Sequence, residues 1–165
     1  MFASAFDRNA PKRELYDALT KSLAAVIDGE TDPIANLANA AALLWEALPD
    51  INWAGFYRLE GSELVLGPFQ GRPACVRIAL GKGVCGTAAA RRETVVVADV
   101  LKFPGHIACD AASRSEIVVP LIFRGALVGV LDVDAPRESR FDDEDRAGLE
   151  EFVRKLAPGI ASISR

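Results

Sequence analysis

Two long apolar runs in the C-terminal half of the chain predict a β-hairpin with acidic residues gathered at one end. The runs cover residues 116–123 and 126–134, and a two-residue joint that contains glycine connects them. Residues two apart on a strand share a face, so Asp132 and Asp134 are expected to project together. The start of the first strand lies beside the end of the second, which places Glu116 near both aspartates. Carboxylates at the end of an apolar sheet are costly to bury, and we infer that they bind something.

The cysteines are the second feature with chemical potential. Cys109 lies in a polar loop three residues after His106, and a thiolate is the reactive form of cysteine. The alternative is a small buried hydrophobic residue, but the polar surroundings favour a functional role. His106 either tunes Cys109 or is simply solvated. Cys85 stands near the start of a predicted helix, which favours a thiolate, although packing explains it equally well. Cys75 is expected in the core unless it lies within disulfide reach of Cys109.

Composition excludes several classes of protein. The chain has 165 residues, 19 basic and 23 acidic side chains and a net charge of −4, which argues against binding to nucleic acid or an anionic membrane. No apolar run approaches the length of about 20 residues that spans a bilayer, and no secretory signal is visible, so we expect a cytoplasmic protein. Three cysteines and one histidine, without a CxxC pair, predict neither a disulfide framework nor a metal site.

The hydrophobic periodicity predicts an α+β fold. Helices are expected at residues 11–27, 33–48, 84–92 and from Asp142 onward, and strands at 53–59, 63–66, 75–80, 94–97 and in the hairpin. Gly67-Pro68 is expected to end the second strand, with a loop at 69–73, and a long loop at 99–114. We expect one domain, 1–165, whose residues 1–10 form an N-terminal segment that can be disordered. It contains an antiparallel sheet of about six strands, with the terminal helices on one face and a loop-covered pocket on the other.

Two aromatic residues complete the candidate pocket. Trp53 and Tyr57 alternate onto one face of the strand 53–59. Such residues usually belong to the core, but beside carboxylates they form a cage that suits an ammonium group. Two close carboxylates also raise each other's pKa, so that one of them can hold a proton near neutral pH and donate it.

Six segments resemble the free methionine-(R)-sulfoxide reductase family, whose members are built on a GAF domain. They are NWAGFY at 52–57, LGPFQG at 66–71, ACVRI at 74–78, GKGVCGTA at 81–88, HIACDAASRSEIVVPL at 106–121 and GVLDVD at 129–134. The resemblance covers roughly residues 10–155. Because the GAF fold also hosts regulatory sensors, the cysteines within these motifs are the specific part of the match.

The resemblance implies reduction of free L-methionine (R)-sulfoxide, without a tightly bound cofactor. Cys109 would be the attacking thiolate and would become a sulfenic acid. Cys75 would resolve it as a disulfide, which thioredoxin would then reduce. Family members differ in whether the cysteine of GVCG, here Cys85, or that of HIACD attacks first. A homodimer is expected from the resemblance alone.

The resemblance also assigns the acids and the aromatic residues. Glu116, Asp132 and Asp134 would hold the substrate ammonium and supply the proton, and Trp53 and Tyr57 would enclose the S-methyl end or orient the acids. Two alternatives stay open at this point. A non-enzymatic GAF sensor explains the fold and the pocket but not three thiols, and a redox sensor would use its disulfide as the signal.

Overall fold

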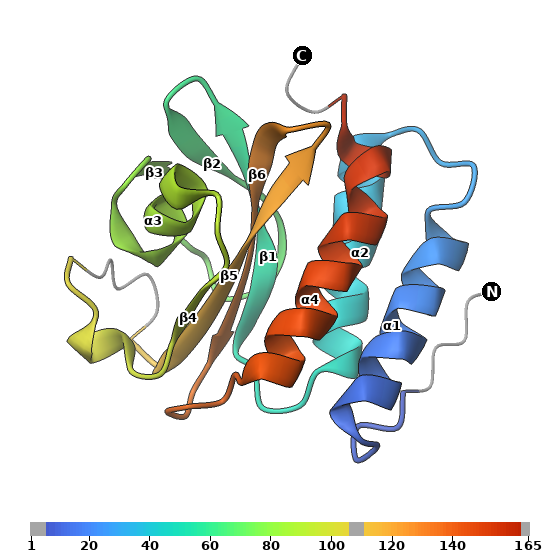
Figure 1. The fold of residues 1–165 in the computed structure, drawn as a ribbon, viewed down its shortest axis with the longest axis horizontal. Helices are drawn as coiled ribbons and strands as arrows, with labels where there is room; N and C mark the ends of the chain where they lie inside the picture. Colours follow the sequence, from blue (N-terminus) through green and yellow to red (C-terminus); the bar gives the residue numbers. More distant parts are fainter. Residues whose placement is uncertain (1–5, 106–110, 163–165) are drawn as a thin grey trace.

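A six-stranded antiparallel sheet in the order β3-β2-β1-β6-β5-β4 forms the middle of the molecule (Figure 1). The structure is a computed structural model that describes residues 6–105 and 111–162. Its elements are α1 (Lys12–Val26), α2 (Pro33–Ala47), β1 (Trp53–Glu60), β2 (Glu63–Gly71), β3 (Arg77–Ala79), α3 (Gly83–Arg91), β4 (Val95–Val97), the 3₁₀ helix η1 (Val100–Lys102), β5 (Ser115–Phe123), β6 (Ala126–Ala135), α4 (Asp143–Leu156) and the 3₁₀ helix η2 (Ala157–Ile160). The α+β architecture and the number of strands are confirmed.

The three long helices lie on one side of the sheet and α3 lies on the other (Figure 1). α2 and α4 pack against the strands, and α1 contacts both of these helices. Their starts follow from the sequence. Asp32 caps α2 through Ala35 N at 2.8 Å, with Pro33 in the first turn. Asp142 caps α4 in a reciprocal capping box with Asp145.

The β5–β6 hairpin places the acids as the sequence predicts. Arg124 and Gly125 form its turn with φ values of 49° and 78°, the doubly left-handed geometry that matches the twist of two strands. The resulting register sets Glu116 opposite Asp134. In the same register Asp132 is opposite Val118, so both aspartates lie at the end of the hairpin where β5 begins.

The sheet separates two apolar cores, and the alternation of side chains decides which residues enter each. Leu131 and Val133 of β6 pack with the long helices, whereas Val130 packs on the other side together with Trp53 and Tyr57 of β1. Asp132 has the same parity as Val130 and therefore faces the side of the sheet that α3 covers. The predicted location of the pocket, opposite the terminal helices, is confirmed.

The predicted end of the second strand at Gly67-Pro68 is wrong. β2 continues to Gly71, with Leu66 opposite Tyr57 and Phe69 opposite Gly55. Two residues of β2 thus oppose one residue of β1, which is a β-bulge, and a bulge accommodates a proline that cannot donate to the ladder. The predicted loop therefore begins only after Gly71.

The strand expected at 75–80 is also shorter than predicted. The residues of β3 pair with residues 63–65 of β2, and one further backbone hydrogen bond joins Leu66 N to Val76 O at 3.0 Å. Cys75 consequently lies before the strand and is half-buried. At the N-terminus, Phe6 packs against the helical core and Arg8 donates to Leu48 O at 2.7 Å.

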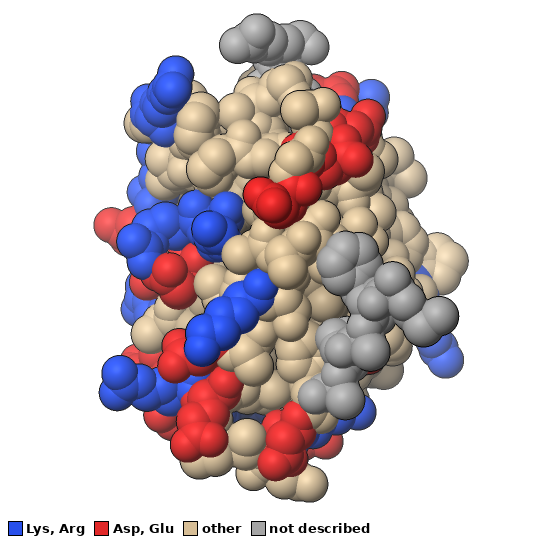
Figure 2. All heavy atoms as spheres, turned by 90° about the vertical axis from the view of Figure 1, so that its right-hand side faces the viewer, with Lys and Arg blue, Asp and Glu red and all other residues tan. Residues whose placement is uncertain are grey.

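The face of the molecule that lies on the right of Figure 1 carries charges of both signs (Figure 2). Lysine, arginine and acidic side chains are interspersed there, with uncharged atoms between them. This mixture agrees with the small net charge of −4. No described helix is long and apolar enough to cross a membrane.

Candidate active site

A small pocket lies between β1, β5, β6 and α3, on the face of the sheet away from the long helices. Its walls combine two aromatic rings, one thiol, three carboxylates and a serine with the backbone around the start of α3: Trp53, Tyr57, Pro73, Ala74, Ile78, Lys82, Gly83, Val84, Cys85, Ser113, Glu116, Asp132 and Asp134. The cavity measures about 40 Å³, enough for a few water molecules.

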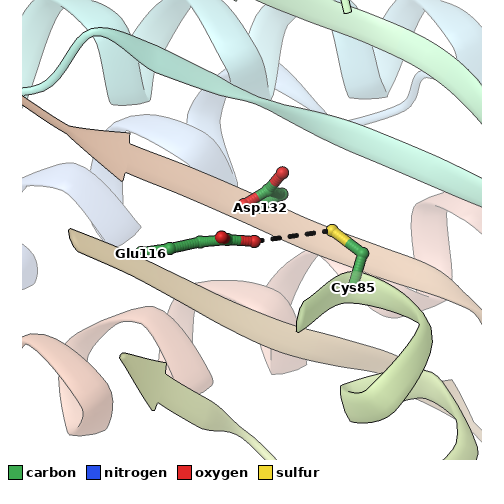
Figure 3. A group of neighbouring side chains, drawn as sticks. All are labelled: Cys85, Glu116 and Asp132. Carbon is green, nitrogen blue, oxygen red and sulfur yellow. Dashed lines mark hydrogen bonds between the residues drawn. The ribbon is translucent and has the colours of Figure 1, made fainter. Parts of the chain in front are cut away.

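The carboxylates gather at the floor of this pocket. Glu116 is 6% exposed and Asp132 is 7% exposed, while Asp134 is half-buried. The Cys85 thiol donates to Glu116 Oε1 at 3.9 Å (Figure 3). One ligand atom each from Cys85, Glu116 and Asp132 lies within 4.8 Å of the others, so this group could also hold a metal ion.

Burial keeps protons on the acids. Burial, and then the charge of Asp132, raise the pKa of Glu116 well above its usual value. Burial raises the pKa of Asp132 to about 7, although hydrogen bonds from Cys85 and Glu116 counteract part of this rise. Near neutral pH the pair therefore retains at least one proton that it can donate to a bound group.

Cys85 is the third residue of α3 and is 4% exposed. A position at a helix N-terminus favours a thiolate. Burial outweighs this effect and, together with the charges of Asp132 and Glu116, raises the pKa of the Cys85 thiol well above its usual value. Cys85 is therefore held as a neutral thiol, which makes it a hydrogen-bond donor and a poor nucleophile.

Aromatic rings form one wall. Trp53 stacks on Phe69 with ring centroids 5.3 Å apart and on Tyr57 at 6.0 Å. The Trp53 indole donates to Arg72 O at 3.1 Å, and the Tyr57 hydroxyl donates to Cys75 O at 3.0 Å. Burial, followed by the charge of Asp132, raises the pKa of Tyr57, so its hydroxyl remains a donor. These bonds fix the segment that carries Cys75 against the rings.

Cys75 is disulfide-bonded and half-buried, and it packs against the apolar core that contains Trp53 and Tyr57. Among the described residues the free cysteine is Cys85. Cys109 and His106 lie outside the described residues. The structure thus brings Cys85 together with the three acids, Trp53 and Tyr57 in one pocket.

Two residues of the site escaped the sequence analysis. Phe69 was expected in a loop, and only the continuation of β2 through the bulge brings it onto Trp53. Ser113 is 5% exposed, lines the pocket and accepts from Asn52 Nδ2 at 3.0 Å. No spacing pattern in the sequence places Phe69 or Ser113 in the pocket. Phe69 and Ser113 both lie within the resemblance motifs, at 66–71 and 106–121, which is the one signal that could have drawn attention to them.

Comparisons with known proteins show the family of this chain. The family model described as GAF domain matches residues 35–161. The free methionine-R-sulfoxide reductase of Escherichia coli is 54% identical over 151 residues, which are 92% of this chain and 92% of the relative.

Two solved structures are similar over nearly their whole length. The free methionine-R-sulfoxide reductase of Neisseria meningitidis in complex with its substrate has a TM-score of 0.93 at 46% identity and covers 98% of this chain and 96% of its own. A putative GAF sensor protein from Burkholderia vietnamiensis has a TM-score of 0.89 at 57% identity and covers 93% of this chain and 100% of its own. The chain thus belongs to the GAF domain family and, within it, to the free methionine-R-sulfoxide reductases.

Proposed function

We propose that this protein reduces free L-methionine (R)-sulfoxide to methionine. The observation that carries the proposal is a small pocket in which buried acids retain a proton between aromatic rings and the segment of a disulfide-bonded cysteine. A sulfoxide oxygen needs a proton to leave sulfur, and this pocket supplies one in a place with little water. The names of the relatives from Escherichia coli and Neisseria meningitidis support the same activity.

The acids also explain selectivity for the free amino acid. Oδ1 of Asp132 is buried and has no hydrogen-bond partner among the described residues, so it offers an acceptor to an incoming cation. Asp132 and Asp134 would receive the substrate ammonium, and Trp53 and Tyr57 would enclose the S-methyl end. A peptide-bound methionine sulfoxide has no ammonium group, and it would leave buried carboxylates unpaired.

The proposed reaction has two steps, reduction of the sulfoxide and formation of a disulfide. The Cys109 thiolate attacks the sulfoxide sulfur while the Glu116–Asp132 pair gives a proton to the oxygen. The oxygen passes to the Cys109 sulfur, methionine leaves, and Cys109 becomes a sulfenic acid. The Cys75 thiol then displaces this hydroxyl as water and forms a disulfide with Cys109. The disulfide-bonded state of Cys75 and the free state of Cys85 support this pairing.

Recycling requires two electrons and two protons from outside. A dithiol donor of the thioredoxin type would reduce the disulfide by thiol exchange, and Cys75 is only half-buried, which leaves part of this residue open to such a donor. This cycle needs a reducing compartment, and we propose the cytoplasm. The homodimer implied by the family resemblance stays a prediction.

A coupled assay tests the proposal. The purified chain with thioredoxin, thioredoxin reductase and NADPH should oxidise NADPH when free methionine (R)-sulfoxide is added. The (S) epimer and a peptide that contains methionine (R)-sulfoxide should give no reaction. Cys109→Ser should abolish turnover. Equal rates with both epimers, or undiminished turnover by Cys109→Ser, would refute the assignment.

Counting thiols separates the reductase from a GAF sensor. The reduced chain has three cysteines, and one equivalent of substrate added without reductant should consume two of their thiols and release one methionine. A sensor that only binds a small molecule would lose none. A redox sensor would lose thiols with peroxide but show no preference for the (R) epimer.

A further inference from the structure

The thiol of Cys85 and the two buried carboxylates beside it form a ligand set that the proposed reaction does not fully use. Their ligand atoms lie within 4.8 Å of one another, and all three residues are buried (Figure 3). They come from different elements, since Cys85 is in α3, Glu116 in β5 and Asp132 in β6. The sequence did not predict a metal site because its Cys and His residues are too few. Only the fold brings two carboxylates to the thiol.

The geometry is close to that of a tetrahedral zinc site. With Zn–S and Zn–O bonds of about 2.3 and 2.1 Å, two ligand atoms of such a site are about 3.4–3.6 Å apart. Cys85 Sγ and Glu116 Oε1 are 3.9 Å apart, and all three ligand atoms lie within 4.8 Å of one another, so an ion would draw the side chains closer by up to about 1 Å. A fourth position remains open toward the cavity, where a water molecule fits.

A second observation indicates that the pocket can accept a cation. Asp132 is 7% exposed, and its Oδ1 has no hydrogen-bond partner within residues 6–105 and 111–162. Such an unsatisfied buried oxygen costs free energy that a cation would recover. The mixture of a soft thiolate with carboxylates favours Zn²⁺, Co²⁺ or Cd²⁺ over Mg²⁺ and Ca²⁺, which take oxygen ligands alone.

We propose that the substrate-free pocket binds Zn²⁺ through Cys85, Glu116 and Asp132, and that the bound ion excludes the substrate. Binding replaces the thiol proton and the proton held by the acids, which leave to solvent, and no redox step is involved. The ion occupies the carboxylates that would hold the substrate ammonium and donate the proton. The inhibitory part rests on the proposed function, whereas the metal site itself does not.

Cobalt absorption tests the site without measuring activity. In the oxidised chain Cys75 is disulfide-bonded and Cys85 is free, so a thiol count of one defines the starting protein. Titration with Co²⁺ without oxygen should give a thiolate-to-cobalt absorption band that saturates at one equivalent, and Zn²⁺ should remove it. Cys85→Ser should lack the band, and Asp132→Asn should weaken Co²⁺ binding by at least about tenfold.

Two controls keep the result interpretable. Asp17→Asn removes an exposed carboxylate on α1 and should leave Co²⁺ binding unchanged. The reduced Cys75→Ser/Cys109→Ser variant retains Cys85 as its one thiol and should give the same band. Absence of the band from both the oxidised chain and this variant would overturn the proposal. An unchanged affinity in Asp132→Asn and Glu116→Gln would do so as well.

Inhibition links the site to turnover. Zn²⁺ should raise the apparent KM for the sulfoxide in competition with it, and a chelator should restore the rate. A Cys85-dependent band in a chain that does not reduce the sulfoxide would leave the site standing and refute the proposed function. Turnover in a chain that shows no absorption band would refute the metal site and leave the proposed function standing.

Discussion

The Glu116–Asp132 pair must hold a proton and also attract a cation. A single carboxyl group cannot do both at once, because it is neutral when it is protonated. Asp132→Asn removes an acid whose pKa is raised to about 7 by burial. We expect kcat/KM to fall by about 10²–10⁴-fold, the usual contribution of a positioned acid. The alkaline side of the pH profile, where the wild type loses this proton, should move.

The rate of sulfoxide reduction between pH 5 and 9 measures this effect, with Asp17→Asn as the matched control on an exposed helix face. A wild-type profile in Asp132→Asn would show that the proton comes from elsewhere.

The neutral thiol of Cys85 leads to a different expectation. Its hydrogen bond to Glu116 is 3.9 Å long and therefore weak, and its other polar partner is Asp132, so Cys85→Ala should lower turnover by no more than about tenfold. The Cys85→Ala variant should still form the proposed disulfide between Cys75 and Cys109. Its count of free thiols should therefore fall from two to zero after one equivalent of substrate. Loss of all activity, or thiols that persist, would instead make Cys85 part of the covalent pathway.

At the scale of secondary structure, the hairpin turn sets the register that aligns the acids. Gly125 has φ 78° and its Cβ position is open, so a substitution there tests backbone strain alone. Gly125→Val should lower the free energy of unfolding by about 1–2 kcal/mol, whereas Gly125→Asn should cost less because asparagine tolerates this conformation. Denaturant unfolding measures both. A larger loss for asparagine than for valine would contradict the strain argument.

The elements differ in how far the sequence predicts them. The β5–β6 hairpin and the starts of α2 and α4 were predicted because their signals are local: alternation, a glycine turn, and the residues that begin each helix, at 33 and from Asp142 onward. β2 was predicted too short because Pro68 looks like a strand breaker when its partner is unknown. The bulge that accommodates it exists only in the register against β1.

The same limit applies to the site. Alternation along β6 predicted that the aspartates share a face, and alternation along β1, together with the resemblance, predicted the aromatic wall. The neutral state of Cys85 could not be predicted, because it depends on burial by α3 and on charges from β5 and β6. A local sequence pattern does not contain such long-range packing. The position of Cys85 at a helix N-terminus therefore suggested a thiolate, whereas the fold keeps this side chain as a neutral thiol.

For the whole molecule, the site should reduce stability at neutral pH. The pKa of Asp132 rises from 3.8 to about 7 on folding, so the folded state keeps a proton that the unfolded state has lost. Below pH of about 4, Asp132 therefore does not lower the free energy of unfolding. Its destabilising effect grows as the pH rises toward 7. The full effect is on the order of 4 kcal/mol. Asp142 acts in the opposite direction, because Lys12 and the capping box hold its pKa at about 2, although burial alone would raise it.

Thermal unfolding of the reduced protein between pH 3 and 8 separates the two contributions. Asp132→Asn should raise Tm relative to wild type at pH 8 and change it little at pH 4, since the amide carries no charge to bury. Asp142→Asn should lower Tm at neutral pH and converge with wild type as pH falls toward 2. If Asp132→Asn destabilised the chain equally at every pH, the acids would be structural ion-pair partners and not a strained site maintained for its ligand.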